Sequence, residues 1–455
     1  MTKRRIHVVG VGGPGTSALA IILREMGHDV SGSDVHETPL LGQLRDIGVV
    51  VNVPHDEQVV VGCDIVTHSA AVRQTNIEIV AARESGVTVL SRAAMLGWVA
   101  AQADTVAVAG THGKTTTTTL LTLMLRAAGR DPGYLIGAEV PQLPRSAHWG
   151  RGPFVIEADE SDSSHRAIKP RATILTNVDV DHLDEHGSFD GVVASFDAYL
   201  GDVPGPKVVC VDDPTASRLA RAHGAITYGF VDATTTASDV EHHSGGTQFV
   251  VRDESGSYDV NLPLRGRHNV LNFLAAFTMA GRLGVDPRVA IESVRGFGGV
   301  RRRFEIRAVD GGATFVDDYA HLPAEIAAVL GAVRAERPAW KRVIAVFQPN
   351  RFNRMAVMSD AYRDAFIDAD LVVVTDIYAS GTDRIDGVTG RLVVDAVRAA
   401  HPQARVEWCR ERADLVDFVA REARSGDVCI SMGCGDIETL PDEVVARRRD
   451  LTRGG

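Results

Sequence analysis

The stretch Val106-Ala107-Val108-Ala109-Gly110-Thr111-His112-Gly113-Lys114-Thr115-Thr116, VAVAGTHGKTT, predicts a phosphate-binding loop between a buried strand and a helix. The general pattern has a glycine where this chain has Val108, so we interpret Val106–Ala109 as the strand and Gly110 as the start of a shorter loop. Backbone N–H groups can then surround phosphates at the helix start, with Lys114 neutralising the β- and γ-phosphates and Thr115 offering its hydroxyl to Mg²⁺. A chance Gly-Lys-Thr in a turn fits this context poorly.

Length, charge and composition limit the kind of protein that this chain can be. A chain of 455 residues is too long for one ordinary hydrophobic core and indicates several domains. Aromatic residues make up only 5% and the net charge is −11, which disfavours nucleic acid as a partner. No apolar run is long enough to cross a bilayer, and the five scattered cysteines predict neither disulfides nor a zinc site. We therefore expect a cytoplasmic monomer or homodimer with no membrane insertion.

Strands and helices alternate in three successive sections, residues 1–103, 104–303 and 304–455. The first opens with a strand at 6–9, a glycine-rich turn and a helix ending at Gly27, as dinucleotide-binding folds do. The second contains the phosphate loop, and its residues 232–262 are typical of an antiparallel insertion or a sheet edge. In the third, strands from Thr314 onwards alternate with helices and predict a parallel sheet covered by helices. The predicted fold class is α/β, with three domains in series.

Gly10-x-Gly12-x-x-Gly15 lies between the first strand and the first helix, where free backbone N–H groups can bind a phosphate. Asp34 follows the second strand, at a position suited to a ribose hydroxyl. These residues favour nucleotide or diphosphate binding, and the alternative is a tight structural turn. The motif does not by itself establish hydride transfer.

A carboxylate for the metal of the phosphate loop is expected in Phe154–Asp162, FVIEADESD. Glu157 directly follows the apolar part of this strand and is the better candidate, because Mg²⁺ takes few carboxylates besides waters and phosphate oxygens. The alternative is a polar loop at a sheet edge. Four acids among residues 157–162 repel one another, however, and a bound cation relieves that repulsion.

Three further stretches of the second section carry polar side chains suited to a nucleotide. His182, within Thr176–His186, suits a second metal or a substrate phosphate, although a lone histidine is more often structural. Asn269 and Asn272 share one face at the start of a helix, where they can bind an adenine edge or cap the helix. An arginine of Arg301–Arg303 can reach a transferring phosphoryl group, and the alternative is a solvated basic linker.

In the third section, polar stretches follow three of the strands. They are Asp317–His321, DDYAH, Gln348–Arg354, QPNRFNR, and Gly433–Asp436. Open α/β sheets bind ligands at the carboxyl ends of their strands, so these stretches are candidate parts of a site. Arg351 and Arg354 are three residues apart and can hold a carboxylate.

Together these motifs resemble those of the Mur ligases, ATP-dependent enzymes that add amino acids to a UDP-linked muramyl precursor. The order GTHGKTT, EADESD, NVDVDHLD, GRHNVLN, GVRRRFE and DDYAH is the family's own and spans essentially the whole chain. GVGGPG with SGSD and the form EADESD most resemble the members that use L-alanine. The resemblance implies a UDP-binding Rossmann-like domain over 1–103, a central ATP-binding domain over 104–303, and a C-terminal Rossmann-like domain over 304–455 that closes on the site.

The resemblance also implies roles for the matching residues. ATP would be bound by the loop Gly110–Thr116 and by Asn269, Asn272, Arg303 (with Arg302 as the alternative) and Asp318. Mg²⁺ would be bound by Thr115, Glu157 and, at a second metal site, His182. The UDP-linked substrate would contact Gly12, Gly13, Gly15, Asp34, Ser69 and Ser161, and the acyl and amino-acid end would be lined by Tyr319, His321, Arg351 and Arg354. Catalysis would depend on Lys114, Glu157, His182, Arg303 and His321.

The expected reaction is a two-step ligation. The γ-phosphoryl group passes to the precursor carboxylate, and the amine of L-alanine then displaces phosphate, with His321 as candidate base. Three departures from the L-alanine members are Gly13-Pro14-Gly15-Thr16 in the first loop, Leu322 for the second His of His-His-Pro, and Asn350 for the His of Gln-Pro-His-Arg. No lysine lies between Arg171 and Lys207, so the carbamylated lysine of some relatives is not expected.

Three alternatives to this reaction stay open. A paralogue would run the same chemistry on another amino acid or carboxylate. A nicotinamide oxidoreductase would use the first glycine motif, but it leaves GTHGKTT and EADESD unexplained. A non-catalytic ATP-binding switch would release phosphate independently of any amine.

Overall fold

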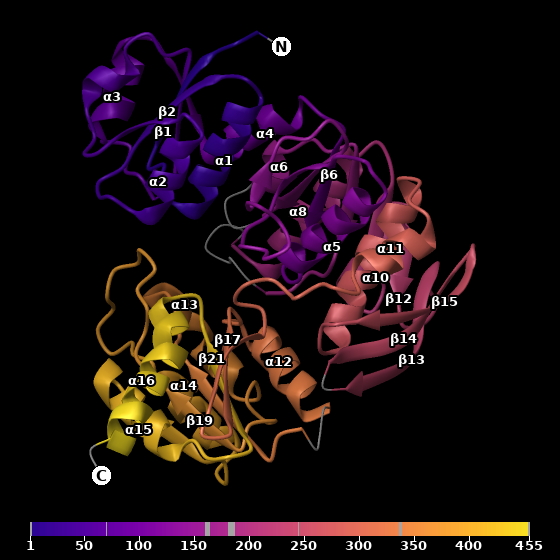
Figure 1. Cartoon of the computed structure of the whole chain (residues 1–455), viewed down its shortest axis with the longest axis vertical. Coiled ribbons are helices and arrows are strands. Elements are labelled where there is room, and N and C mark those ends of the chain that lie inside the picture. The colour runs from indigo at the N-terminus through magenta and orange to yellow at the C-terminus, as the bar shows by residue number, and fades with distance from the viewer. Residues whose placement is uncertain are drawn as a thin grey trace. The chain divides into compact units, whose positions relative to one another are not determined.

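The computed structural model describes residues 2–69, 71–159, 164–180, 187–243, 245–335 and 339–453 (Figure 1). The chain forms two compact units, one of Met1–Val240, Phe249–Val260 and Asn269–Phe297, the other of Glu241–Gln248, Asn261–His268 and Gly298–Gly455. The described residues form three separate sheets, of five, ten and six strands. The expected domain borders after residues 103 and 303 fall between these sheets.

The first sheet is parallel, with strand order β3-β2-β1-β4-β5. Its strands are β1 (Arg5–Val9), β2 (Asp29–Ser33), β3 (Val50–Asn52), β4 (Ile65–His68) and β5 (Thr88–Ser91). Ile6 and Val8 face the helices α1 (Pro14–Glu25), α2 (Pro39–Asp46) and α4 (Arg92–Ala100), whereas Val9 faces α3 (Ile77–Glu84) and η1 (Glu57–Val60). The strand order reverses at β1, so the glycine loop after β1 lies at the point where such sheets bind ligands.

The central sheet places the phosphate loop between two motifs that are distant in the sequence. Its order is β15-β14-β13-β12-β11-β10-β6-β9-β7-β8. β6 (Thr105–Ala109) runs parallel between β9 (Phe154–Ala158) and β10 (Ala172–Leu175), and Ala109 lies opposite both Ala158 and Leu175. The residues that follow these strands therefore meet at one edge of the sheet.

The other elements of the central section extend this sheet and cover it. The strands are β7 (Gly133–Leu135), β8 (Ala147–His148), β11 (Lys207–Cys210) and β12 (Ile226–Gly229). The helices are α5 (Lys114–Ala127), α6 (Ser164–Ala167), α8 (Phe189–Asp202), α9 (Pro214–Ala222), α10 (Arg267–Arg282) and α11 (Pro287–Ser293). β13 (Thr235–His243), β14 (Gly246–Asp253) and β15 (Gly256–Leu262) form one edge, which confirms the prediction of a sheet edge over 232–262.

The third sheet, of order β16-β17-β21-β18-β19-β20, is mixed rather than wholly parallel. β16 (Glu305–Asp310), a strand that the sequence did not indicate, pairs antiparallel with β17 (Ala313–Asp318), whereas the strands predicted from Thr314 onwards are parallel to one another. The cause is a hairpin turn at Gly311 and Gly312, whose φ values of +55° and +78° suit a two-residue turn. The parallel strands are β18 (Arg342–Phe347), β19 (Leu371–Val374), β20 (Val406–Trp408) and β21 (Asp427–Met432).

Helices cover both faces of the third sheet. Val316 and Ala345 pack in a core with α12 (Pro323–Ala335), α13 (Phe352–Met358), η2 (Ser359–Tyr362) and α14 (Arg391–Ala400). Phe315 and Val346 pack on the other face with α15 (Arg412–Glu422), η3 (Asp436–Thr439) and α16 (Leu440–Arg453). Among the described residues, no helix has the length and apolarity needed to cross a bilayer. All five cysteines carry free thiols.

Candidate nucleotide and ligation site

The phosphate loop begins at Gly110, as the sequence predicts. Val108 is 0% exposed in β6, where it pairs with Ile174 and Glu157, so its side chain belongs to the core. Gly110 has φ +117°, and a Cβ at this residue would lie 2.2 Å from the Thr176 hydroxyl. Glycine is therefore required at the first loop residue and not at the position of Val108.

Lys114 is the first residue of α5, and its ammonium group folds back over the loop. Its Nζ donates to the carbonyl oxygens of Gly110 at 2.7 Å and Thr111 at 3.2 Å. The same nitrogen lies 3.7 Å from Oδ1 of Asp159, which follows β9. The cation is thus held at the N-terminal end of a helix, where a phosphate would be bound.

Thr115 and Glu157 form the candidate metal site. The Thr115 hydroxyl donates to Oε2 of Glu157 at 3.0 Å, and the Gly137 amide donates to Oε1 at 2.6 Å. Burial raises the pKa of the Glu157 carboxyl, and the Gly137 hydrogen bond and the charge of Lys114 oppose that rise. A hydroxyl and a carboxylate side by side are the hard oxygen donors that Mg²⁺ prefers, so these residues fit the ion that the sequence predicts.

Residues after β10 fix the shape of the loop, a role that the sequence did not reveal. The Asn177 side chain accepts from the His112 amide at 2.8 Å and donates to the His112 carbonyl at 3.1 Å. The Thr176 hydroxyl donates to the same carbonyl at 2.6 Å, and the His112 ring lies 3.0 Å from the Asp179 carboxylate. The clue in the sequence was that Thr176–Asp179 directly follow a strand, which the sheet order places beside β6.

Asn272 packs against the beginning of α5. It is 7% exposed, its Oδ1 accepts from the Thr117 hydroxyl at 3.3 Å, and its Nδ2 donates to Asn269 at 3.1 Å. A Cβ at Gly113 would lie 2.3 Å from the same Oδ1. The two asparagines share one face of α10 beside the loop, Asn269 being the more exposed of the pair. His182 and Ser161, by contrast, lie outside the described residues.

In the N-terminal sheet, the predicted substrate residues gather at the carboxyl edge. The Gly12 amide donates to Oδ2 of Asp34 at 2.8 Å, so this carboxylate lies on the glycine loop. The amide of Gly13 donates to the Gly10 carbonyl at 3.3 Å, and the amide of Ser69 donates to the Val9 carbonyl at 3.1 Å. Gly15 is the second residue of α1 and lies beside Arg92, a neighbour that the sequence did not indicate.

The second unit brings three motifs to one sheet edge. β21 lies between β17 and β18, and Asp318, Met432 and Phe347 are in register. The stretches DDYAH, QPNRFNR and Gly433–Asp436 therefore lie next to one another. The side chain of Gln348 donates to Asp436 at 2.7 Å and joins two of them.

Asp318 organises the backbone around Arg303. Its carboxylate accepts from the amides of Phe304 and Ala320, both at 2.7 Å. Burial raises the pKa of the Asp318 carboxyl, and the charge of Arg303 opposes this. The guanidinium of Arg302 donates to Asp317 at 3.1 Å and to the Gly433 carbonyl at 2.8 Å, and both Arg302 and Arg303 lie over the Tyr319 ring, at 4.9 Å and 5.2 Å from its centroid. Arg302 therefore holds the fold, which leaves Arg303 as the better candidate for phosphate.

His321 is oriented by Glu325, a residue that the sequence did not single out. Oε2 of Glu325 accepts from the amides of His321 at 2.9 Å and Leu322 at 3.1 Å, and it lies 3.2 Å from Nδ1 of His321. The Tyr319 carbonyl is a second acceptor 3.1 Å from Nδ1. Two acceptors at Nδ1 favour the tautomer with its proton there, which leaves the Nε2 lone pair free to accept a proton. The sequence offered one indication of this contact, namely that Glu325 is an acidic residue in the first turn of α12, four residues after His321.

The two arginines of QPNRFNR differ in their surroundings. Arg354 is 7% exposed and donates to Oδ1 of Asn350 at 2.9 Å, so Asn350 fixes this guanidinium. Arg351 has φ +61°, and its amide donates to the Tyr378 carbonyl at 2.9 Å. A left-handed non-glycine residue is strained, and strain of this kind is typical of binding sites.

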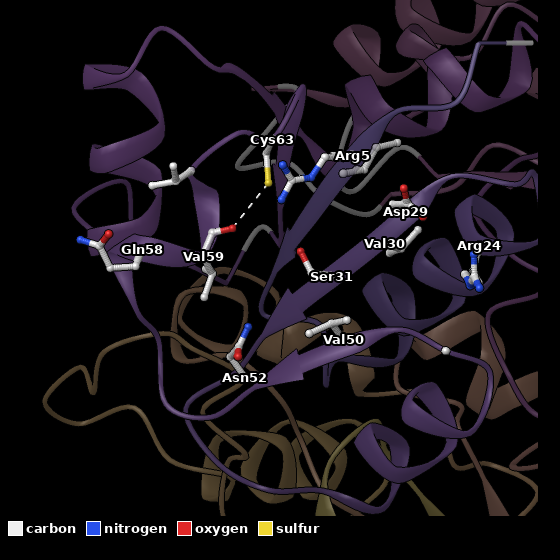
Figure 2. Close-up of a pocket in the computed structure, with 13 residues that line it drawn as sticks. Arg5, Arg24, Asp29, Val30, Ser31, Val50, Asn52, Gln58, Val59 and Cys63 are labelled. Atoms are coloured by element: carbon white, nitrogen blue, oxygen red, sulfur yellow. Dashed lines mark hydrogen bonds between the residues drawn. The ribbon is translucent and has the colours of Figure 1, made fainter.

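A cleft of about 460 Å³ lies on the first sheet, away from the motifs (Figure 2). The first residues of β1, β2 and β3 (Arg5, Asp29 and Val50) line it, whereas the glycine loop follows the other end of β1. Cys63 donates to the Val59 carbonyl at 3.5 Å, and burial raises the pKa of this thiol. The Cys63 thiol is therefore not activated, and the cleft is separate from the candidate site.

The fold and the site define an α/β nucleotide-binding protein with a phosphate loop. The family model "Mur ligase family, catalytic domain" matches residues 5–104, "Mur ligase middle domain" matches 108–280, and "Mur ligase, glutamate ligase domain" matches 302–435. The chain belongs to the Mur ligase family, which confirms the resemblance and the three-domain α/β fold. An oxidoreductase leaves the second and third matches unexplained.

Similar proteins include ligases of full length. The chain is 38% identical to a UDP-N-acetylmuramate–L-alanine ligase of Rubrobacter xylanophilus, covering 97% of this chain and 100% of that protein. It is 41% identical to the ligase of that name from Kineococcus radiotolerans, with 97% and 95% covered. The crystal structure of the UDP-N-acetylmuramate-alanine ligase of Thermotoga maritima is similar with a TM-score of 0.81, at 29% identity and with 98% and 100% covered.

Proposed function

We propose that this protein uses ATP to join L-alanine to the carboxylate of UDP-N-acetylmuramate, with release of ADP and phosphate, as a step of peptidoglycan precursor synthesis in the cytoplasm. The similarity over the full chain to ligases of that name supports the substrates. The arrangement at the end of β6 carries the chemistry, since Lys114, Thr115 and Glu157 meet around one phosphate loop.

The first step transfers the γ-phosphoryl group of ATP to an oxygen of the sugar-acid carboxylate, which gives an acyl phosphate and ADP. Lys114 would turn from the loop carbonyls to the phosphate oxygens and offset their charge, and Arg303 is proposed for the same role from the family resemblance. Thr115 and Glu157 would hold Mg²⁺, which lowers the cost of the charge on the transferring group when it is bound. His182, as a ligand of a second metal, belongs to the same proposal.

The second step forms the amide bond. The neutral amine attacks the acyl carbon, the tetrahedral intermediate expels phosphate, and the amine gives up a proton. His321 is the candidate acceptor for that proton, because Glu325 and the Tyr319 carbonyl both lie at Nδ1 and leave Nε2 free. Arg351 and Arg354 would hold the carboxylate of the amino acid, the second of them fixed by Asn350.

The second candidate is a paralogue that uses another amino acid. It is favoured by Leu322 and Asn350, the two departures at this end of the site. Leu322 is 3% exposed, so its side chain packs in the core at the start of α12. The substitution therefore removes a polar group from this end without adding an exposed apolar surface.

The test is phosphate release with UDP-N-acetylmuramate, ATP and Mg²⁺ across a panel of amino acids. We expect release that depends on L-alanine and is lost in Lys114→Ala. Release with a different amino acid only would establish the paralogue. Phosphate release that is independent of any amine would support an ATP-binding switch, and no release with any amino acid would refute the proposal.

A further inference from the structure

Helix α4 begins at the predicted substrate loop of the first sheet. Its first residue, Arg92, lies over Gly15, and a Cβ at Gly15 would be 2.8 Å from Nε of Arg92. The buried side of the helix, through Met95, Leu96 and Val99, belongs to the core that is shared with the central sheet. α4 is therefore a packed element whose beginning contacts the glycine loop.

The middle of α4 packs directly on α6, as Figure 1 shows at the junction of the first two sheets. A Cβ at Gly97 would lie 2.5 Å from the carbonyl oxygen of Ala167 and 3.0 Å from its carbonyl carbon. These are backbone atoms, so they cannot rotate away as the end of a side chain can. Only glycine allows the two helices to approach this closely.

α6 in turn is tied to the acidic motif and to the phosphate loop. The Ser164 hydroxyl accepts from the Asp159 amide at 2.9 Å and donates to the Asp159 carbonyl at 3.1 Å. The Asp159 carboxylate lies 3.7 Å from Nζ of Lys114. A continuous series of contacts thus joins the glycine loop of the first sheet to the lysine of the phosphate loop.

We propose that Gly97 is a positioning residue for the phosphoryl-transfer step. Its packing on Ala167 sets the glycine loop at the distance from the phosphate loop at which a substrate carboxylate reaches the γ-phosphate. The inference rests on the proposed function, because it assumes that the two loops bind the two reactants. An added methyl group needs about 0.9 Å to reach an ordinary contact of 3.4 Å, and a misplacement of about 1 Å costs roughly 100-fold in rate.

A second contact supports the same junction. Glu25, the last residue of α1, accepts from the Trp149 amide at 2.7 Å and lies 3.0 Å from Nδ1 of His148. Its side chain is partly exposed, so Glu25→Gln weakens the junction without introducing a steric clash. It therefore tests the junction in a variant that is expected to fold.

The test compares Gly97→Ala with Gly281→Ala, a glycine of α10 at which an added Cβ would meet no atom within 4 Å. We expect Gly97→Ala to lower kcat by about 10- to 100-fold and to leave the KM values for ATP and for UDP-N-acetylmuramate within about twofold, since each reactant keeps its own loop. Gly281→Ala should match the wild type. A kcat for Gly97→Ala within threefold of the Gly281→Ala value would overturn the inference.

Glu25→Gln decides the matter if Gly97→Ala does not fold. It should lower kcat at least threefold with the KM values for ATP and for UDP-N-acetylmuramate again unchanged, and a kcat equal to that of the wild type would overturn the inference. The thermal shift produced by ATP should be the same in all variants, because the triphosphate loop lies within the central section. A wild-type protein without ligation activity would instead refute the proposed function, so the two failures are distinguishable.

Discussion

Two threonines in α5, Thr115 and Thr118, differ in whether their hydroxyl groups form a hydrogen bond. The same substitution at the two residues therefore tests the role of the Thr115 hydroxyl, with Thr118 as the control. Thr115 is 8% exposed, and its hydroxyl donates to the Glu157 carboxylate at 3.0 Å. Thr118 is 0% exposed, and its hydroxyl has no hydrogen-bond partner among the described residues. Replacement by valine keeps the branched shape and removes only the hydroxyl.

The structure sets the size of each effect. A hydrogen bond to a charged group contributes about 1.5–3 kcal/mol, so Thr115→Val should lower kcat/KM for ATP by about 10- to 160-fold if the hydroxyl serves the metal–nucleotide complex. Burying an unpaired hydroxyl costs about 1–3 kcal/mol, so Thr118→Val should raise the free energy of unfolding by about 1 kcal/mol and leave kcat/KM unchanged. The two variants therefore separate the site from the core.

Phosphate release with varied ATP and Mg²⁺ measures the first effect, and thermal unfolding without nucleotide measures the second. Thr115→Ser is the additional control, because it restores the hydroxyl and should recover most of the activity. A Thr115→Val enzyme within twofold of the wild type would refute the assignment of this hydroxyl. Equal losses of activity in both valine variants would show that packing of α5, and not the hydroxyl, is what the substitution disturbs.

Three further predictions concern the carboxylates and the loop. Burial raises the pKa of Glu157, so protonation should weaken Mg²⁺ binding as pH falls through that pKa, and Glu157→Gln should bind Mg²⁺ weakly with little pH dependence in titrations. Gly110→Ala places a Cβ 2.2 Å from the Thr176 hydroxyl, and we expect calorimetry to show ATP binding weakened at least 10-fold, which is about 1.4 kcal/mol. Gly129→Ala is the control, because an added Cβ there meets no atom within 4 Å, and it should leave ATP binding unchanged. Burial raises the pKa of the Asp317 carboxyl from 3.8 to about 6, so between these pH values the folded protein holds a proton that the unfolded chain releases. The free energy of unfolding should therefore fall by about 3 kcal/mol as the pH rises from 4 to above 6. Chemical denaturation across this pH range should show no such fall for Asp317→Asn.

Local sequence order predicted the phosphate loop because one continuous stretch builds it. The strand, the loop and the helix are neighbours in the chain, and Val108 could be placed in the strand from its apolar neighbours alone. The pairing of Glu157 with Thr115 was also predictable, because a carboxylate at the end of a buried strand meets the loop whenever the two strands are adjacent. The structure supplies that adjacency, since β9 pairs with β6.

Contacts between distant segments could not be predicted from the sequence. Asn177 holds the phosphate loop because β10 is the other neighbour of β6, a matter of strand order that the sequence does not contain. Glu325 resembles an ordinary acid at a helix start until the fold places it beside the His321 ring. In the sequence, Gly97 is an ordinary glycine within a helix. Only the position of the Ala167 carbonyl in the fold explains why a larger residue would not fit there.

The distribution of strain and charge separates the parts of the site that are built in advance from those that substrates must complete. In the phosphate loop, the Lys114 ammonium group donates hydrogen bonds to two carbonyl oxygens, and the Glu157 carboxylate accepts hydrogen bonds from two donors. These charged groups therefore have hydrogen-bond partners within the loop before a nucleotide binds. In the second unit, Arg351 is held at φ +61°, a conformation that costs about 1–3 kcal/mol and persists only where its surroundings fix it. The hydrogen bonds of its neighbours, Asn350 with Arg354 and the Arg351 amide with the Tyr378 carbonyl, supply that restraint. The phosphate loop is therefore preformed, whereas the turn at Arg351, which we propose binds the amino acid, is strained and depends on Asn350 for its shape. On that proposal, a change of amino-acid preference should arise from substitution of Asn350 before it arises from substitution of Lys114.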